Sequence, residues 1–117
     1  MDSRIAIATD FTKYPGPRYK ASGPYSGELF REEILIPALD EAIRGGSKVV
    51  VDLDDVAGYG SSFLEESFGG LIRRGYSKAD LDQHLVILAR RPQFRHHALR
   101  AYQYIEEEVA RNQETAH

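Results

Sequence analysis

The chain has 117 residues with 42% apolar content, so we expect one domain over residues 1–112 and a frayed tail over residues 113–117. Its formal net charge of -3 argues against nucleic-acid binding, which depends on clustered Lys and Arg side chains. The absence of cysteine excludes disulfides, thiolate metal sites and cysteine nucleophiles, and the absence of a leader-like or bilayer-length apolar run predicts a cytoplasmic protein outside the membrane.

The N-terminal quarter reads as a strand followed by an irregular connection. Apolar side chains alternate loosely over residues 4–11, which predicts a first strand with both faces partly covered. Residues 13–25 contain two Pro-Gly clusters and cannot be regular throughout, and we expect only a short strand over residues 18–21. Three tyrosines of this connection are expected to cover the edge of the core: Tyr14, Tyr19 and Tyr25.

A first long helix is predicted from Ser26 to about Arg44. Ser26 suits an N-cap, and apolar side chains recur every four residues from Phe30. Pro37 removes one backbone hydrogen bond, so we expect a kink over residues 33–37.

The central strand and its turn carry the most distinctive pattern. Val49, Val50 and Val51 in a row predict a buried, parallel interior strand. Gly58 and Gly60 then flank Tyr59. The glycines allow the backbone to take positive φ values and turn sharply, and we expect the tyrosine to point outward.

A second helix is predicted to begin on Ser62. Ser62 and Glu65 fit the capping box, and apolar residues follow at helical spacing. Gly69 and Gly70 weaken this helix by roughly 1 kcal/mol each relative to alanine, so we expect them to permit close approach of a neighbouring element.

The remaining elements complete an α/β pattern. Ser77 suits the cap of a short helical turn, residues 84–89 read as a buried parallel strand, and a third helix follows from Phe94. Right-handed crossovers then give a mixed four-stranded sheet packed with about three helices.

The run at residues 52–71, Asp-Leu-Asp-Asp-Val-Ala-Gly-Tyr-Gly-Ser-Ser-Phe-Leu-Glu-Glu-Ser-Phe-Gly-Gly-Leu, resembles the bacterial STAS-like domain family of unassigned function. Upstream residues add to this resemblance: Asp10, Phe11, Gly16, Arg18, Ser26, Gly27, Glu28, Phe30, Arg31 and Glu33. The family is related to anti-sigma factor antagonists. The resemblance implies a STAS-like fold and a regulatory, signal-transducing role without enzymatic activity.

The same resemblance implies a protein partner, an ATPase or kinase of the histidine-kinase type. Antagonists of that kind are phosphorylated on a serine after the central strand, within an Asp-Ser-Ser-Gly motif. The corresponding serines here are Ser61 and Ser62, within Gly60-Ser61-Ser62-Phe63. The expected interaction surface comprises Gly58, Tyr59, Gly60, Phe63 and Glu66.

A basic run crosses the start of the third helix and could pair with an anion at this turn. It comprises Arg90, Arg91, Arg95, His96, His97 and Arg100. Bases at a helix start oppose the macrodipole preference, so the arrangement invites a reason beyond helix stability, although a solvated face explains it equally well. Both the run and the turn fall at the carboxyl edge of a parallel sheet. The expected anion-pairing residues are Arg90, Arg91 and Arg95.

Two other functions are open to this sequence. Asp52 and Asp54 resemble the first motif of haloacid-dehalogenase-type phosphatases, which would use Mg²⁺, but aspartates at a strand end more often satisfy turn backbone. A small anionic ligand could also bind at the start of the second helix.

We therefore predict no catalytic residues and no cofactor. We also predict no metal site, because His96 and His97 diverge by about 100° on a helix and cannot chelate together without a third ligand from elsewhere.

Overall fold

The computed structural model describes residues 2–115, with side chains described as far as Asn112. Three strands form one parallel sheet in the order β1 (Ser3–Ala6), β2 (Val49–Asp52), β3 (Leu85–Leu88). The central strand is thus β2, as predicted. The prediction of a mixed, four-stranded sheet is wrong: within the described residues the sheet has three strands, all parallel.

The strand predicted over residues 18–21 does not form. A 3-10 turn, η1 (Lys20–Ser22), takes part of its place. The carbonyls of Pro17 and Arg18 accept hydrogen bonds from the backbone N–H groups of Gly27 and Glu28, at 2.9 and 3.0 Å. The backbone acceptors of this segment are therefore hydrogen-bonded to the start of a helix and not to a sheet edge.

The first strand is also shorter than predicted, because a helical turn, α1 (Ile7–Asp10), replaces its second half. Ile7 and Phe11 lie four residues apart, a spacing that satisfies a helix as well as an alternating strand. The Asp10 carboxylate accepts from the Ala6 N–H at 2.7 Å, which helps to end the strand there.

The first long helix runs as predicted through α2 (Gly27–Phe30), η2 (Arg31–Leu35) and α3 (Ile36–Gly45). The Ser26 hydroxyl caps it by accepting from the Leu29 N–H at 3.0 Å. The irregularity expected near Pro37 is the π-helical turn η2. Such turns occur frequently at functional sites.

The second long helix comprises α4 (Ser61–Leu64), η3 (Glu65–Gly69) and α5 (Gly70–Arg73), and it too contains a π-helical turn, η3. Its N-cap is Gly60, and no side chain caps it. The prediction of a capping box on Ser62 is therefore wrong, because the N-cap lies two residues earlier and Glu65 pairs with arginines instead.

The last third of the chain contains α6 (Lys78–His84), a 3-10 turn η4 (Pro92–Phe94) and α7 (Arg95–Thr115). Ser77 caps α6 as predicted, accepting from the Asp80 N–H at 3.1 Å. The structure thus adds α1 and α6 to the three long helices predicted. Residues 116–117 of the predicted frayed tail lie outside the described residues. No helix in the described chain has the length and apolarity to cross a membrane.

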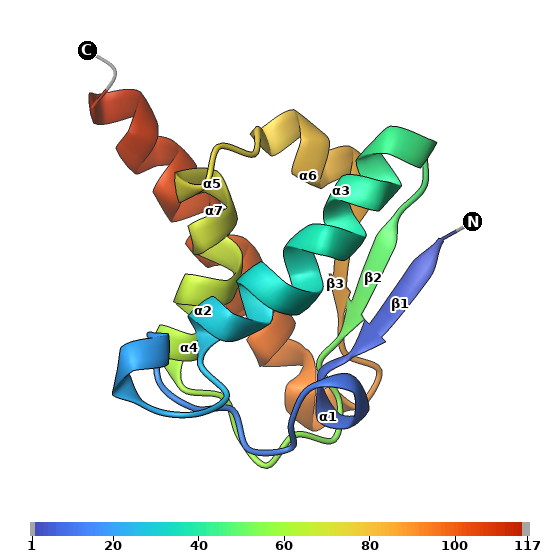
Figure 1. Ribbon diagram of the computed structural model, residues 1–117, viewed down its shortest axis with the longest axis vertical. Coiled ribbons are helices and arrows are strands. Elements are labelled where there is room, and N and C mark those ends of the chain that lie inside the picture. Colours follow the sequence, from blue (N-terminus) through green and yellow to red (C-terminus); the bar gives the residue numbers. More distant parts are fainter. Residues whose placement is uncertain (1, 116–117) are drawn as a thin grey trace.

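One apolar core joins the sheet to the helices. In Figure 1 the strands lie along one side of the molecule, and most of the helical segments lie on the other. The carboxyl ends of β1 and β2 point toward α1 and toward the loops that follow the strands. The largest fully buried apolar side chains are Phe30, Phe63, Phe68, Ile7, Leu35, Leu39, Leu53 and Leu71.

Both outer strands have an N–H group satisfied by a side chain. On β1 the Ala6 N–H donates to the Asp10 carboxylate, and on β3 the Ile87 N–H donates to the Tyr102 hydroxyl at 2.7 Å. Exposed strand edges invite pairing with other chains. These two side chains reduce the number of edge donors that a further strand could use.

Candidate functional site

Two loops meet at the carboxyl edge of the sheet. The connection from β1 to α2 and the connection from β2 to α4 are joined by a hydrogen bond from the Ala57 N–H to the Lys13 carbonyl, at 2.8 Å. Figure 1 shows these blue and green loops side by side below the strands. In parallel α/β folds, ligands usually bind at this edge of the sheet.

Asp52 and Asp54 are buried here, and both serve the loops. Asp52 pairs with Arg4 and accepts from the Asp54 N–H at 2.9 Å. Asp54 accepts from the Arg90 and Arg91 N–H groups at 3.0 and 3.1 Å. Each carboxylate oxygen thus has a donor within the protein, and the two side chains tie together the ends of β2 and β3.

Tyr59 does not point outward, so that prediction is wrong. Its hydroxyl donates to the Leu53 carbonyl at 2.9 Å, and its ring contacts those of Phe63 and His97, with centroids 6.1 and 4.9 Å away. Burial, together with the charges of Asp52 and Asp54, raises the pKa of Tyr59 far above its ordinary value. The tyrosine is a neutral hydrogen-bond donor that closes the turn on itself.

The flanking glycines do not use the positive φ values that are open to them. Gly60 has φ -73°, Gly58 also lies outside the left-handed region, and the left-handed residue of this loop is Asp55 at φ 70°. A side chain added at Gly58 or Gly60 would meet no atom within 4 Å. Both glycines are exposed, and neither conformation nor packing within the protein requires them.

The expected interaction surface is only partly exposed. Phe63 is fully buried in the aromatic cluster with Phe11 and Phe30, and Glu66 is only 6% exposed. Their predicted exposure is wrong, because the π-helical turn η3 packs against the first long helix. Gly58, Gly60 and Ser61 are exposed and Ser62 is half-buried.

Glu66 is held by a buried arginine from the other π-helical turn. Arg31 in η2 donates from Nη1 to the Glu66 carbonyl at 2.8 Å and to its carboxylate at 2.5 Å. The close approach predicted from Gly69 and Gly70 is confirmed: a Cβ at Gly70 would lie 2.3 Å from Arg31 Nη1. A Cβ at Gly69 would lie 3.3 Å from the Tyr104 carbonyl of α7.

Further ion pairs extend from this buried pair to the surface. Glu65 pairs with Arg18 and with Arg73, and Arg73 also contacts Glu108 at 3.1 Å. Burial alone would raise the pKa of Glu65, but hydrogen bonds from Arg73 and Arg18 outweigh it and lower that pKa. The network fixes the β1–α2 loop and α7 against η3.

A small pocket opens between the start of α4 and the first turns of α7. It has a volume of about 190 Å³ and is lined by Tyr59, Ser61, Leu64, His96, His97, Arg100 and Tyr104. The sequence placed Ser61 at this edge, with His97 and Arg100 in the basic run beside it, but it did not single out His97, Arg100 and Tyr104 as the residues that face Ser61. Their spacing of three and four residues puts them on one face of a helix, which was the available signal.

Of the arginines predicted to pair with an anion beside Ser61, two have side-chain partners elsewhere. Arg91 pairs with Asp55 at 3.0 Å and the Arg95 guanidinium donates to the Arg90 carbonyl at 3.5 Å, whereas the bond of Arg90 to Asp54 is made by its backbone N–H. None of the three lines the pocket that contains Ser61. The cation at that pocket is Arg100, one to two helical turns farther along.

The rings of the two adjacent histidines contact each other, with centroids 3.9 Å apart and planes tilted by 41°. Burial and the neighbouring His96 lower the pKa of His97. Among the described residues, no three His, Cys, Asp or Glu side chains gather as metal ligands.

The tyrosines of the β1–α2 loop do not cover the core as expected. Tyr14 is 73% exposed, Tyr19 51% and Tyr25 47%. Tyr25 makes an edge-on contact with Phe11 and has a left-handed φ of 54°. Three aromatic side chains therefore face solvent on the loop that lies beside the turn at residues 57–60.

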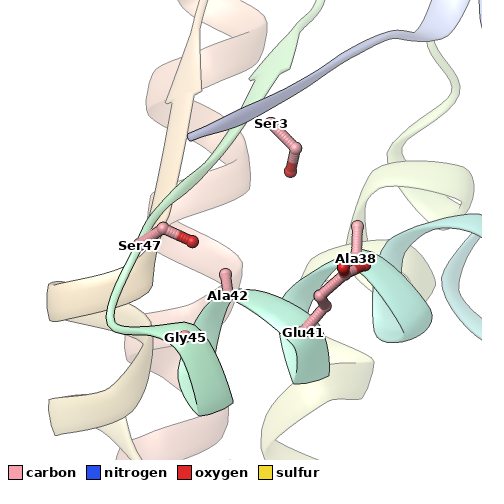
Figure 2. A pocket seen from close by; sticks show the side chains of 6 residues that line it. All are labelled: Ser3, Ala38, Glu41, Ala42, Gly45 and Ser47. Carbon is pink, nitrogen blue, oxygen red and sulfur yellow. The ribbon is translucent and has the colours of Figure 1, made fainter. Parts of the chain in front are cut away.

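A second hollow lies at the opposite, amino end of the sheet. It is about 270 Å³ and lies between β1 and α3. Figure 2 shows its lining by Ser3, Ala38, Glu41, Ala42, Gly45 and Ser47. Glu41 is its one charged side chain, and it gathers none of the predicted site residues.

Comparison with known proteins supports the resemblance seen in the sequence. Searches of curated proteins and of solved structures gave no match. A family model described as a STAS-like domain of unknown function matches residues 26–89, from the cap of α2 to the residue after β3. The matched segment contains both π-helical turns and the loop after β2. Since it covers more than half of the chain, the protein belongs to the family of STAS-like domains of unknown function.

Proposed function

We propose that the protein is a non-enzymatic, cytoplasmic regulatory module of the anti-sigma factor antagonist type, which binds a protein partner through the carboxyl edge of its sheet. By resemblance to such antagonists, the partner is an ATPase or kinase of the histidine-kinase type. The proposed surface, here called the edge surface, comprises Tyr14, Tyr25, Gly58, Gly60 and Ser61.

The observation that carries the proposal is the pair of exposed glycines. Gly58 and Gly60 leave bare backbone at the surface, although their φ values suit any residue and the space around them is empty. Glycine at such a position destabilises the folded chain by its entropy. A partner that approaches the backbone closely accounts for a feature that the fold itself does not need.

The exposed tyrosines supply the apolar contact. Aromatic residues are enriched among those that dominate binding energy. Tyr14 follows Lys13, whose carbonyl is bonded to Ala57, so it lies next to the glycine turn. Tyr14 and Tyr25 take the role of aromatic anchor that the sequence suggested for Tyr59.

Ser61 is the better placed of the two serines for regulation. It is exposed and caps nothing, whereas Ser62 is half-buried. A phosphate there would add negative charge and three acceptor oxygens to the edge surface. We propose that modification of Ser61 alters partner affinity without altering the fold.

Glutamine substitution of the glycines tests the proposal. The partner to use is the histidine-kinase-type ATPase encoded nearest to this chain, titrated by calorimetry with and without ATP. Gly58→Gln and Gly60→Gln should weaken binding at least tenfold while the melting temperature stays within a few degrees of wild type. Gly45→Gln is the matched control, because Gly45 is also exposed and uncrowded but lies at the other end of the sheet. Equal affinity of all three variants would contradict the proposal.

The phosphatase alternative has a separate test. Asp52 and Asp54 are both engaged with internal donors, which supports a role in joining the strand ends. We expect no Mg²⁺-dependent hydrolysis of a generic phosphate ester above buffer. Hydrolysis that disappears in Asp52→Asn, with the variant still folded, would replace our proposal with the enzymatic one.

A further inference from the structure

The pocket between α4 and α7 is lined by cationic and titratable side chains without a carboxylate. Arg100, His96 and His97 come from α7, and Ser61 and Tyr59 close the opposite wall. Arg100 lies over the Tyr104 ring, with its guanidinium carbon 5.9 Å from the ring centroid. The volume of the pocket, about 190 Å³, is several times what one water needs, so a group the size of a phosphate can enter it.

Arg100 differs from most arginines of this protein. Arg4, Arg18, Arg31, Arg73, Arg74, Arg91 and Arg111 all form ion pairs with carboxylates. Arg100 forms none within the part of the chain that the structure describes. In a protein of net charge -3, an arginine that forms no ion pair with a described residue and lies beside two histidines is a place of local positive potential.

We propose that this pocket binds a phosphate-sized oxyanion, held by Arg100, His97 and the Ser61 hydroxyl, with an affinity that rises as the pH falls. The ligand is either a free oxyanion or the terminal phosphoryl group of a larger molecule. The site does not depend on the partner proposed above, since it needs only the side chains of this chain.

The pH dependence follows from the groups around His97. No carboxylate lines the pocket, and Asp52 and Asp54, whose charges act on Tyr59 from the strand side, are already bonded. Burial and His96 disfavour the charged form of His97, and an anion in the pocket favours it. Binding should therefore take up a proton. The groups facing His97 are Tyr59, Ser61 and Leu64 across the pocket, Phe94 before it, and His96, Arg100 and Tyr104 on α7.

Inorganic sulfate is the probe, because it keeps its double charge across the pH range in which histidine titrates. Sulfate replaces chloride at constant ionic strength, and amide and imidazole NMR signals of the whole chain are followed at about pH 6 and pH 8. We expect saturable shifts at Ser61, His97 and Arg100, tighter binding at the lower pH, and a rise in the pKa of His97. His84 is the internal reference, because it bonds the Ser47 carbonyl at the other end of the sheet.

Two arginine variants test whether sulfate binds in this pocket. Arg100→Gln should weaken sulfate binding about tenfold, since it removes a charge-assisted contact. Arg95→Gln, on the same helix but outside the pocket, should bind within about twofold of wild type. Equal weakening in both variants, shifts that do not saturate, or a pKa of His97 that sulfate leaves unchanged would overturn the proposal. If a phosphorylated serine compound competes with sulfate, the ligand is the phosphoryl group of a larger molecule. If it does not compete, the ligand is a free oxyanion.

Discussion

Arg31 donates two hydrogen bonds to Glu66, one to its backbone carbonyl and one to its carboxylate, at 2.8 and 2.5 Å. The two residues lie in the two π-helical turns, η2 and η3, and both are nearly buried. A π-helical turn leaves backbone carbonyls without their usual helical donor. Arg31 supplies such a donor from the neighbouring helix, so the pair joins two irregularities that neither helix would stabilise alone.

Removal of Arg31 should therefore cost much more than an ordinary surface change. Arg31→Met leaves the Glu66 carboxylate buried, with only the longer contacts to Arg18 and Arg73 at 3.3 Å. We expect a loss of about 3 kcal/mol in the free energy of unfolding, measured by urea titration. The double variant Arg31→Met with Glu66→Met should lose less than the single one, because no uncompensated charge remains. A double variant that is less stable than Arg31→Met would contradict this account.

Gly27 should be needed for the contact between the two long helices. A Cβ at Gly27 would lie 2.6 Å from the Phe63 carbonyl, a backbone atom that cannot move aside without shifting α4. Gly27→Ala should therefore lower the free energy of unfolding by about 2 kcal/mol or more, although alanine is the better helix former. Gly45→Ala is the control. It meets only the Ser47 hydroxyl at 4.0 Å and should be neutral or stabilising by up to about 1 kcal/mol.

The sequence predicted those elements whose signals are local. Val49 to Val51 identified β2, and Ser26 and Ser77 identified two helix starts, because a run of β-branched residues or a capping serine acts within a few residues. The spacing of Ile7 and Phe11 fits both a strand and a helix, so it could not reveal that β1 ends at Ala6.

The candidate site depends on tertiary contacts that no local pattern reveals. Arg31 and Glu66 are 35 residues apart in the sequence, and the Tyr59 hydroxyl bonds a carbonyl that only a closed loop brings near. Helical spacing groups His97, Arg100 and Tyr104, but only the packing of α7 decides that this face meets Ser61. The sequence thus indicates the serines at the helix start but not the side chains that face them.

The cap assignments give a paired prediction. Ser26→Ala removes the acceptor for the Leu29 N–H and should cost about 1 kcal/mol. Ser62→Ala should stay within about 0.5 kcal/mol of wild type, because Gly60 and not Ser62 precedes the helix. Chemical denaturation of both variants checks this difference. A loss at Ser62 equal to that at Ser26 would restore the capping box.

The ion pairs of Glu65 should make stability depend on pH in the acid range. The pKa of Glu65 is lowered from an ordinary value of 4.5, since its bonds to Arg73 and Arg18 outweigh the effect of burial. This carboxylate therefore contributes stability that is present above pH 4.5 and is lost as the pH falls through its lower, folded-state pKa. Glu65→Gln should flatten the fall in urea midpoint below that pH. Glu33→Gln, an exposed control, should leave it unchanged.

Substitutions of Tyr59 test whether the turn is a closed structural unit or a flexible contact loop. Tyr59→Phe removes the donor to the Leu53 carbonyl and should cost about 1 kcal/mol. Tyr59→Ala also removes the ring contacts with Phe63 and His97 and should cost about 3 kcal/mol, whereas Tyr14→Ala at an exposed site should stay within about 0.5 kcal/mol. Thermal melts of the three variants measure these differences. A disordered turn would itself weaken partner binding, so loss of binding in Tyr59→Ala reports on the fold, and only Gly58→Gln or Gly60→Gln tests the edge surface. A Tyr59→Ala variant as stable as wild type would show that Tyr59 does not hold the turn closed.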